Sequence, residues 1–293
     1  MYKRQGVTYR GSCVALLWKK IRNIETSGKT GTLFYGLTDK VYEMSNNQRN
    51  TSMVVCIFAV IIVGAIAVGA LSYYGTSWFN WSSADTDFYF DAEVGATTGT
   101  VTLDIDLDVG GVSITFVDNA SLLYDIEIVV QNTTLDTDGD PTVTFTSNTI
   151  GLVYTAAGVN ITLGSGVNYT LDIDTTTGGI SVALVDGAHV GDVSLTTEIG
   201  GITLAMTDDV VLLGNATFDL DSTTGGVSVV VDVPTGIGGS VEAAVGTGGV
   251  DITATGWTEI TSNHYETSDY DTASQTLTVI IETTTGGITA IFT

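Results

Sequence analysis

The sequence has no basic residue beyond Arg49. Its 293 residues include 9 Lys and Arg and 33 Asp and Glu, which gives a net charge of −24. From Met53 onward there are 30 acidic residues and no Lys or Arg. A surface without cations cannot neutralise phosphates, so nucleic-acid binding by this long part is excluded. Arginine clamps and lysine Schiff bases are excluded there for the same reason.

Cysteine and histidine are nearly as scarce. Cys13 and Cys56 are the only cysteines, so the part beyond them can form no disulfide or thiolate metal site. His189 and His264 are the only histidines and cannot by themselves close a zinc site. No Gly-x-Ser-x-Gly nucleophile elbow is present. We therefore predict a protein that is not an enzyme and that holds no organic cofactor.

There is a single long apolar run, from Met53 to Leu71. Its length is just enough to span a hydrocarbon core of roughly 30 Å, and an aromatic cluster follows it. The basic residues on its N-terminal side orient that side to the cytoplasm. We predict a short cytoplasmic segment at 1–52, a transmembrane signal anchor at 53–74 and an extracellular C-terminal part. The small residues Ala67 and Ala70 leave a cleaved secretory signal open as the alternative.

Residues 1–43 differ in composition from everything that follows. Met44 opens a short polar, basic stretch that leads into the apolar run, as a natural signal anchor does. The first five residues resemble a translated sequencing adapter. We expect 1–43 not to be native sequence, which favours Met44 as the native start and leaves Met1 and Met53 as alternatives. We assign 75–94 to a juxtamembrane linker.

From about Asp85 the chain alternates apolar and polar residues in short runs rich in Val, Ile and Thr, which indicates β-strands. A glycine pair followed by a β-branched residue recurs, and such recurrence is typical of stacked units that bury one another's apolar faces. We predict an all-β, β-helix-like β-solenoid ectodomain over 95–293, with a β-sandwich as the rival architecture. The glycine pairs begin at Gly110, Gly178, Gly200, Gly225, Gly248 and Gly286.

Three of these segments carry a resemblance to a known family. Residues 174–182 read DTTTGGISV, residues 221–229 read DSTTGGVSV, and residues 282–290 read ETTTGGITA. In these segments the chain resembles the putative adhesin family of cell-surface domains. The resemblance covers about 95–293 and implies a β-solenoid that follows a membrane segment. It supplies no catalytic residues.

One acidic turn is a candidate calcium site. Asp136, Asp138 and Asp140 alternate around Gly139, in the way that Ca²⁺ loops present oxygen ligands. The segment departs from the helix-flanked loop because Pro141 stands where glycine is expected. A plain acidic turn between strands is the alternative.

Asn-x-Ser/Thr triplets are more frequent in the sequence than its composition predicts. This pattern indicates N-glycosylation on an extracytoplasmic surface, against the alternative that hydroxyl-rich strands form such triplets by chance. The candidate acceptors are Asn80, Asn119, Asn132, Asn160, Asn168 and Asn215.

These features predict a cell-membrane protein that is anchored by one span and acts as an adhesin-like or envelope structural component. It would recognise a cell-surface glycan or protein through an extended β surface. The alternative is a self-associating filament or envelope-lattice subunit, in which edge strands pair between copies. A carbohydrate-active enzyme is a weaker third reading. The insertion at 256–275 is expected to act as a cap or a binding loop.

Overall fold

The computed structural model describes residues 85–185 and 187–293. These residues belong to the compact unit Thr76–Thr293. The predicted cytoplasmic segment, the anchor at 53–74 and Asn80 lie outside the described residues. Within the described ranges, no helix has the length and apolar character needed to cross a membrane.

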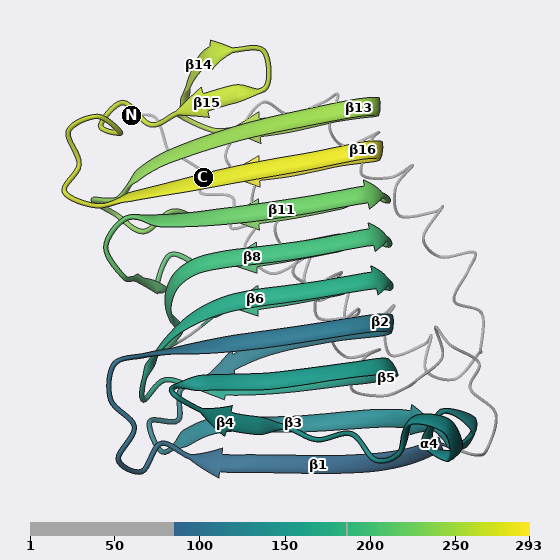
Figure 1. Cartoon of the computed structure of the whole chain (residues 1–293). Helices are drawn as coiled ribbons and strands as arrows, with labels where there is room; N and C mark the ends of the chain where they lie inside the picture. The colour runs from purple at the N-terminus through teal and green to yellow at the C-terminus, as the bar shows by residue number, and fades with distance from the viewer. Residues whose placement is uncertain (1–84, 186) are drawn as a thin grey trace, which may run out of the picture. The chain divides into compact units, whose positions relative to one another are not determined.

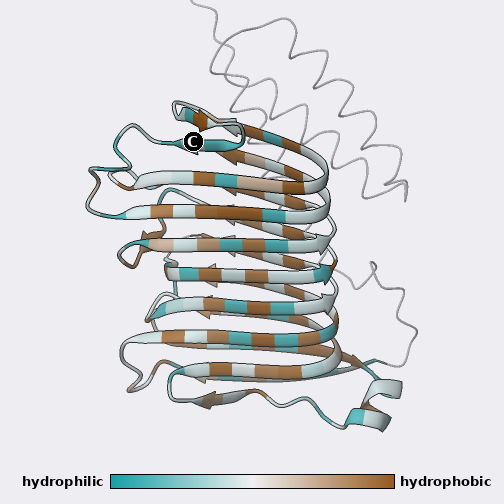
Figure 2. Cartoon of the chain, turned by 45° about the horizontal axis from the view of Figure 1, so that its top comes forward, coloured by the Kyte–Doolittle hydropathy of each residue, from teal (hydrophilic) through white to brown (hydrophobic). Residues whose placement is uncertain are grey.

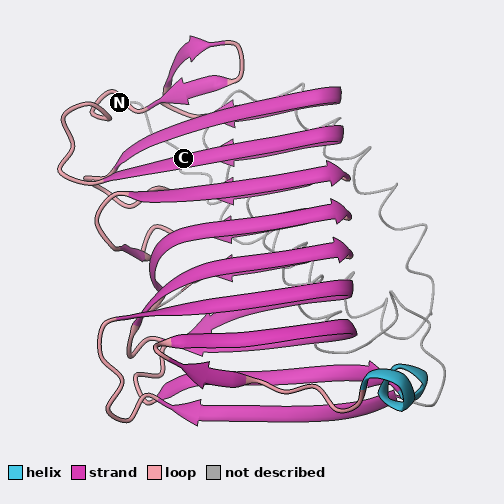
Figure 3. Cartoon of the chain, viewed as in Figure 1, coloured by secondary structure: helices cyan, strands magenta, loops and turns pink. Residues whose placement is uncertain are grey.

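The described chain is almost entirely β-structure, with one short helix (Figures 1 and 3). The first elements are β1 (Asp85–Glu93), β2 (Thr100–Val117), β3 (Leu122–Gln131), α4 (Asn132–Asp138), β4 (Thr144–Thr146), β5 (Thr149–Gly164), β6 (Asn168–Thr177), β7 (Ile180–Leu184) and β8 (His189–Ile199). They are followed by β9 (Ile202–Met206), β10 (Val211–Leu212), β11 (Ala216–Thr224), β12 (Val227–Val231), β13 (Gly238–Ala254), β14 (Thr258–Thr261), β15 (His264–Glu266) and β16 (Thr276–Phe292).

The strands close into a ring, and the predicted β-solenoid is therefore wrong. Eight parallel strands pair in the order β2-β6-β8-β11-β16-β12-β9-β7, and β7 pairs again with β2. The closure arises because β2 and β16 are long enough to pair twice. The first half of β2 pairs with β6 and its second half with β7, and β16 pairs in the same way with β11 and β12.

The ring is flattened into two layers that face each other across the core (Figure 1). β6, β8 and β11 lie in the first layer, and β7, β9 and β12 lie in the second. A glycine pair joins β6 to β7, β8 to β9 and β11 to β12 at the corner between the layers. β2 and β16 cross this corner without a break, so each contributes to both layers.

The alternating sequence fills the space between the layers. Side chains at every second position point inward, and the hydropathy bands along the strands show this alternation (Figure 2). Leu103, Ile173 and Leu220 are fully buried examples. The largest buried side chain is Tyr169, whose hydroxyl donates to the Leu123 carbonyl at 2.6 Å. Burial of this ring raises the Tyr169 pKa.

The glycine pairs stack at one corner of the ring. A Cβ atom on Gly178 would overlap the carbonyl oxygen of Gly110, and one on Gly200 would overlap that of Gly178. The same relation continues to Gly225, Gly286 and Gly248. Parallel backbones therefore approach too closely here for any side chain, and this explains why glycine recurs at the corner.

A buried column of hydroxyls supports the same corner from inside. Ser222 Oγ donates to the Gly200 carbonyl at 3.0 Å, and Thr197 Oγ1 donates to the Gly178 carbonyl at 3.0 Å. Each of these residues lies three positions before a glycine pair. Its hydroxyl donates a hydrogen bond to the carbonyl of the first glycine in the pair of the neighbouring strand. Thr175 occupies the equivalent position, but its buried hydroxyl has no partner among the described residues.

Further strands extend both ends of the ring. At one end β5, β3 and β1 continue the sheet, and β3 is antiparallel to both of its neighbours. β1 lies in the segment predicted as linker. At the other end β13 pairs with β16 along its whole length, and the β14–β15 hairpin covers only Ser240–Glu242 of its free side.

Candidate recognition surface

The outer face of the first layer carries rows of carboxylates. In one row Asp104 lies beside Asp172, and Asp219 follows two strands further on, with Ser194 between them. In the adjacent row Asp106 lies beside Asp174. Neighbouring strands are about 4.8 Å apart, so these side chains form a regular acidic array. Like charges directly opposite one another oppose folding, and the described residues contain no Lys or Arg that could offset their repulsion.

The second row continues to the far edge of the layer. Asp221 lies beside Glu282, and Thr196 separates Asp221 from Asp174. The pKa of Asp174 is raised, first by partial burial and then by repulsion from Asp106, Asp172 and Glu198. The environment of Asp174 therefore disfavours its charged form.

Two open grooves lie on this face. The first, of about 350 Å³, is lined by Thr170, Asp172, Asp192, Ser194 and Asp219, among others. The second, of about 340 Å³, includes Asp221 and Glu282 in its lining. Both grooves present carboxylates and hydroxyls in register. Such surfaces suit hydrogen bonding to an extended ligand.

The outer face of the second layer is nearly uncharged. One row runs through Ser113, Ser181, Thr203, Ser228 and Thr289 before it ends at Asp251 on β13. The two outer faces therefore differ, since one is acidic and the other is rich in hydroxyls. This separation of charge between the two faces follows from the strand register.

The predicted calcium ligands lie on and after α4. Asp136 and Asp138 belong to the helix, and Asp140 follows Gly139. Among residues 85–185 and 187–293, no three His, Cys, Asp or Glu side chains are grouped so that they could hold a metal. The Gly139 carbonyl accepts a hydrogen bond from the Tyr154 hydroxyl at 2.6 Å, which ties this turn to β5. Calcium binding stays a prediction.

The candidate glycosylation residues differ in their surroundings. Asn119, Asn132 and Asn215 are exposed, in turns or at an element end. Asn160 and Asn168 are half-buried on β5 and β6. The amide of Asn160 donates to Glu127 Oε2 at 3.0 Å, so this nitrogen is already engaged in the structure. The exposed three are therefore the better acceptors, and glycosylation itself stays a prediction.

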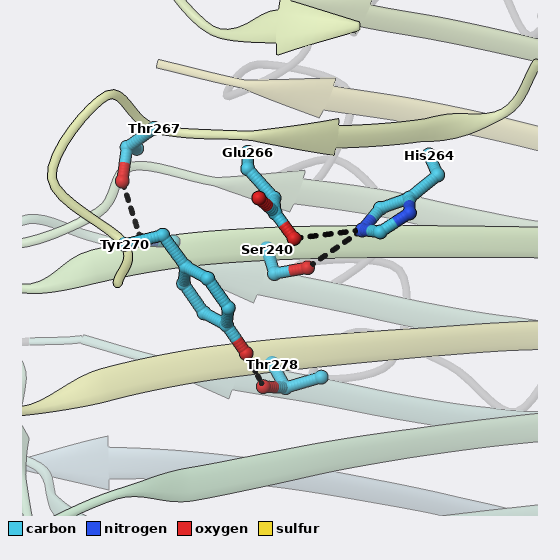
Figure 4. A network of polar contacts seen from close by, with 7 residues as sticks. Ser240, His264, Glu266, Thr267, Tyr270 and Thr278 are labelled. Carbon is cyan, nitrogen blue, oxygen red and sulfur yellow. Dashed lines mark hydrogen bonds and ion pairs between the residues drawn. The ribbon is translucent and has the colours of Figure 1, made fainter. Parts of the chain in front are cut away.

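His264 forms an ion pair with Glu266 at the β13–β15 junction (Figure 4). His264 Nε2 lies 3.1 Å from Glu266 Oε1 and 3.2 Å from Ser240 Oγ. Serine, histidine and a carboxylate invite comparison with a hydrolytic triad. In a triad the acid holds Nδ1 while the serine faces Nε2. Here both partners meet the same nitrogen, so the arrangement cannot relay a proton in that way.

The same region closes part of the core. Trp257 packs on Phe292 with ring centroids 5.2 Å apart, and its ring fills the space that a Cβ on Gly239 would need. The Tyr270 hydroxyl lies 2.9 Å from Thr278 Oγ1 (Figure 4). The insertion at 256–275, expected as a cap or a binding loop, thus covers this end of the core, with Tyr270 on the first-layer half of β16 and Trp257 on Phe292 of its second-layer half.

Sequence reasoning missed the hydroxyl column and the His264 network. The column had a signal, because Thr or Ser stands three residues before four of the glycine pairs. No pattern in the sequence indicates the contact between Ser240 and His264, because these residues meet only through the pairing of β13 with β15.

Comparison with solved structures supports the fold. The chain is similar to a putative cell adhesion protein from Clostridium sporogenes, with a TM-score of 0.58 and 16% identity over 71% of this chain and all (100%) of that one. It also matches a putative adhesin from Bacteroides fragilis, with a TM-score of 0.31 and 10% identity over 72% of this chain and 98% of that one. No family model and no curated protein matches the sequence. The solved structures that it resembles are named as adhesins, and at this identity the likeness concerns the fold.

Proposed function

We propose that this chain is an adhesin-like cell-surface protein that recognises a partner through the outer face of its first layer and does no chemistry. The observation that carries the proposal is the array of carboxylates and hydroxyls held in register across β2, β6, β8 and β11. A sheet fixed by backbone pairing holds these groups at constant spacing. An extended glycan or protein could therefore bind along it with many weak, repeated contacts.

Three further considerations support a non-catalytic role. The described residues include no Lys or Arg that could stabilise a developing negative charge. His264 is not placed as a triad base. The fold is similar to that of a protein named for cell adhesion. The proposed location is the cell membrane, with the anchor at 53–74 and this surface outside the cell.

The test is binding by the full-length chain in detergent to arrays of neutral and amino-sugar glycans and to intact cells. Replacing Asp172 and Asp219 together by Asn should weaken binding at least about tenfold, because both side chains line the first groove. The matched control replaces Glu259 and Asp271, which are exposed elsewhere, by Gln and Asn. Equal losses in the two variants would show that net charge, and not this face, governs binding.

A further inference from the structure

One side of β13 is unpaired over most of its length. Beyond Glu242, no described strand pairs with the side of β13 that faces away from β16. Residues Gly246–Gly249, Asp251 and Thr253 are exposed. An unpaired edge presents a row of N–H and C=O groups to which another strand can add.

The direction of the free backbone groups follows from the ring. The N–H groups of Val112, Ile180 and Ile202 each donate to a glycine carbonyl on the next strand of the second layer. The equivalent residue of β13 is Val250, and no strand follows there. Thr255, an odd number of residues further on, donates instead to Phe292 of β16. The N–H groups of Val250 and Ile252 therefore point away from the sheet.

The apolar side chains at this edge are also incompletely covered. Ile288 and Phe292 on β16 are at most 1% exposed. Their neighbours on β13, Val250 and Ala254, are only partly buried although they pack against the same core. The hairpin pairs with the first-layer half of β13, and Trp257 packs on Phe292 at the end of the second-layer half, while Val250 and Ile252 stay partly exposed. One added strand would bury these side chains and pair the backbone.

The charges identify the kind of strand that fits. The described residues carry no Lys or Arg, so a second copy of this chain would bring like charge against like charge. The β14–β15 hairpin also stands beyond β13 and hinders end-on stacking of two copies. β1, at the opposite end, carries Asp85, Asp87, Asp91 and Glu93, a charged edge that resists strand addition. β13 has only Asp251 in its free part.

We propose that the second-layer half of β13 is a docking edge for an extended, basic peptide segment of a partner protein, which adds to the sheet as one further strand. Main-chain hydrogen bonds supply affinity, and apolar residues at alternate positions pack over Val250 and Ile252. Lys or Arg flanking the segment match the acidic domain. This inference is independent of the first-layer recognition surface.

The probe is a labelled synthetic peptide with the sequence of residues 286–292, Gly-Gly-Ile-Thr-Ala-Ile-Phe, flanked by lysines. This sequence already pairs with β13 on its other side. Fluorescence anisotropy with the full-length chain should show saturable binding. Peptides with glutamate flanks, or with alternate backbone nitrogens methylated, should bind at least about tenfold more weakly, because they lose charge attraction or hydrogen bonds.

Two variants separate the backbone from the side chain. Ile252→Pro removes an outward N–H, which an edge strand tolerates, and should weaken binding by about three- to tenfold relative to Ile252→Ala. Circular dichroism should show the same β-sheet signal in both. Equal peptide affinity in the two variants, or no binding to the unmodified chain, would overturn the proposal. A dimer of the unmodified chain that Ile252→Pro dissociates would instead identify a second copy as the occupant.

Discussion

At the residue scale, the recurring Thr-x-x-Gly-Gly pattern has a specific physical meaning. The glycine allows the backbones at the corner to touch, and the hydroxyl three residues earlier satisfies the carbonyl of the neighbouring glycine. A buried carbonyl without a partner costs about 1–3 kcal/mol. The hydroxyl is thus as much a part of the corner as the glycine.

Thr175 and Thr197 occupy equivalent positions and should respond oppositely to substitution. Thr197→Val removes the donor to the Gly178 carbonyl and should lower the free energy of unfolding by about 1–2 kcal/mol. Thr175→Val removes a buried hydroxyl that has no partner and should leave stability unchanged or raise it by up to about 1 kcal/mol. Urea unfolding of both variants measures the difference. Equal losses would show that Thr175 is satisfied, for example by buried water.

The glycine column makes an equally sharp prediction. Gly200→Ala places a Cβ on the Gly178 carbonyl oxygen, and because backbone cannot move aside cheaply, the cost should be about 3 kcal/mol or more. Gly158→Ala is the matched control, since it also lies in a strand but its Cβ would meet nothing within 4 Å. The control should stay within about 1 kcal/mol of the parent. Similar urea midpoints for the two variants would refute the close-approach explanation.

At the scale of elements, the alternation of apolar and polar residues and the turn residues predicted the strands well. They did not predict which strands pair. The strand at Ile180–Leu184 and the glycine pair before it were evident from the sequence. The closure of the ring was not, because it depends on β2 and β16 crossing the corner unbroken and pairing in both layers. Neither the spacing of the glycine pairs nor the composition indicates which strands pair with each other. The short helix α4 also carried no helical signal, since its seven residues bury no side chain.

The packing of β2, β6 and β8 gives stability a pH dependence through Asp174. Its pKa in the folded protein is raised, by burial and then by Asp106, Asp172 and Glu198. Below the unfolded pKa of about 3.9 the group is protonated in both states and costs nothing. As pH rises from there through the folded pKa, the charged form is disfavoured only in the folded protein, so stability falls.

Asp174→Asn should therefore reduce the loss of stability as pH rises from about 3.9 through the folded-state pKa of Asp174, and it should be more stable than the parent at neutral pH. Thermal unfolding across this range tests it. Asp271→Asn, an exposed loop change outside the array, is the control and should leave the slope unchanged. A parent slope that survives in Asp174→Asn would place the pH dependence elsewhere.

At the scale of the whole molecule, the one-sided charge is the property that the sequence predicts most directly. The absence of Lys and Arg from the described residues needs no fold to establish. What the fold adds is its distribution, because strand register concentrates carboxylates on the first-layer face and on β1 while it leaves the second-layer face almost neutral. Electrostatic repulsion is therefore local and strong on one face.

Such a domain should become more stable as salt rises. Between about 0.01 M and 0.15 M ionic strength the screening length falls from roughly 30 Å to about 8 Å, which weakens repulsion across the array. The unfolded chain keeps the same charges but holds them further apart, so it gains less from screening. The free energy of unfolding should rise with sodium chloride, and a decrease would contradict the expectation.

Comparing calcium with sodium at equal ionic strength separates screening from a specific site. Screening alone predicts similar stability in the two salts, apart from a modest advantage for the divalent ion. A site at Asp136, Asp138 and Asp140 predicts instead a saturable gain at low calcium concentration, following the mass action of a ligand that binds only the folded state. Asp138→Asn should abolish that gain and keep the sodium response. If the gain survives this variant and disappears in Asp172→Asn, the cation is held by the carboxylate array, and the acidic turn beside α4 serves only to connect β3 with β4.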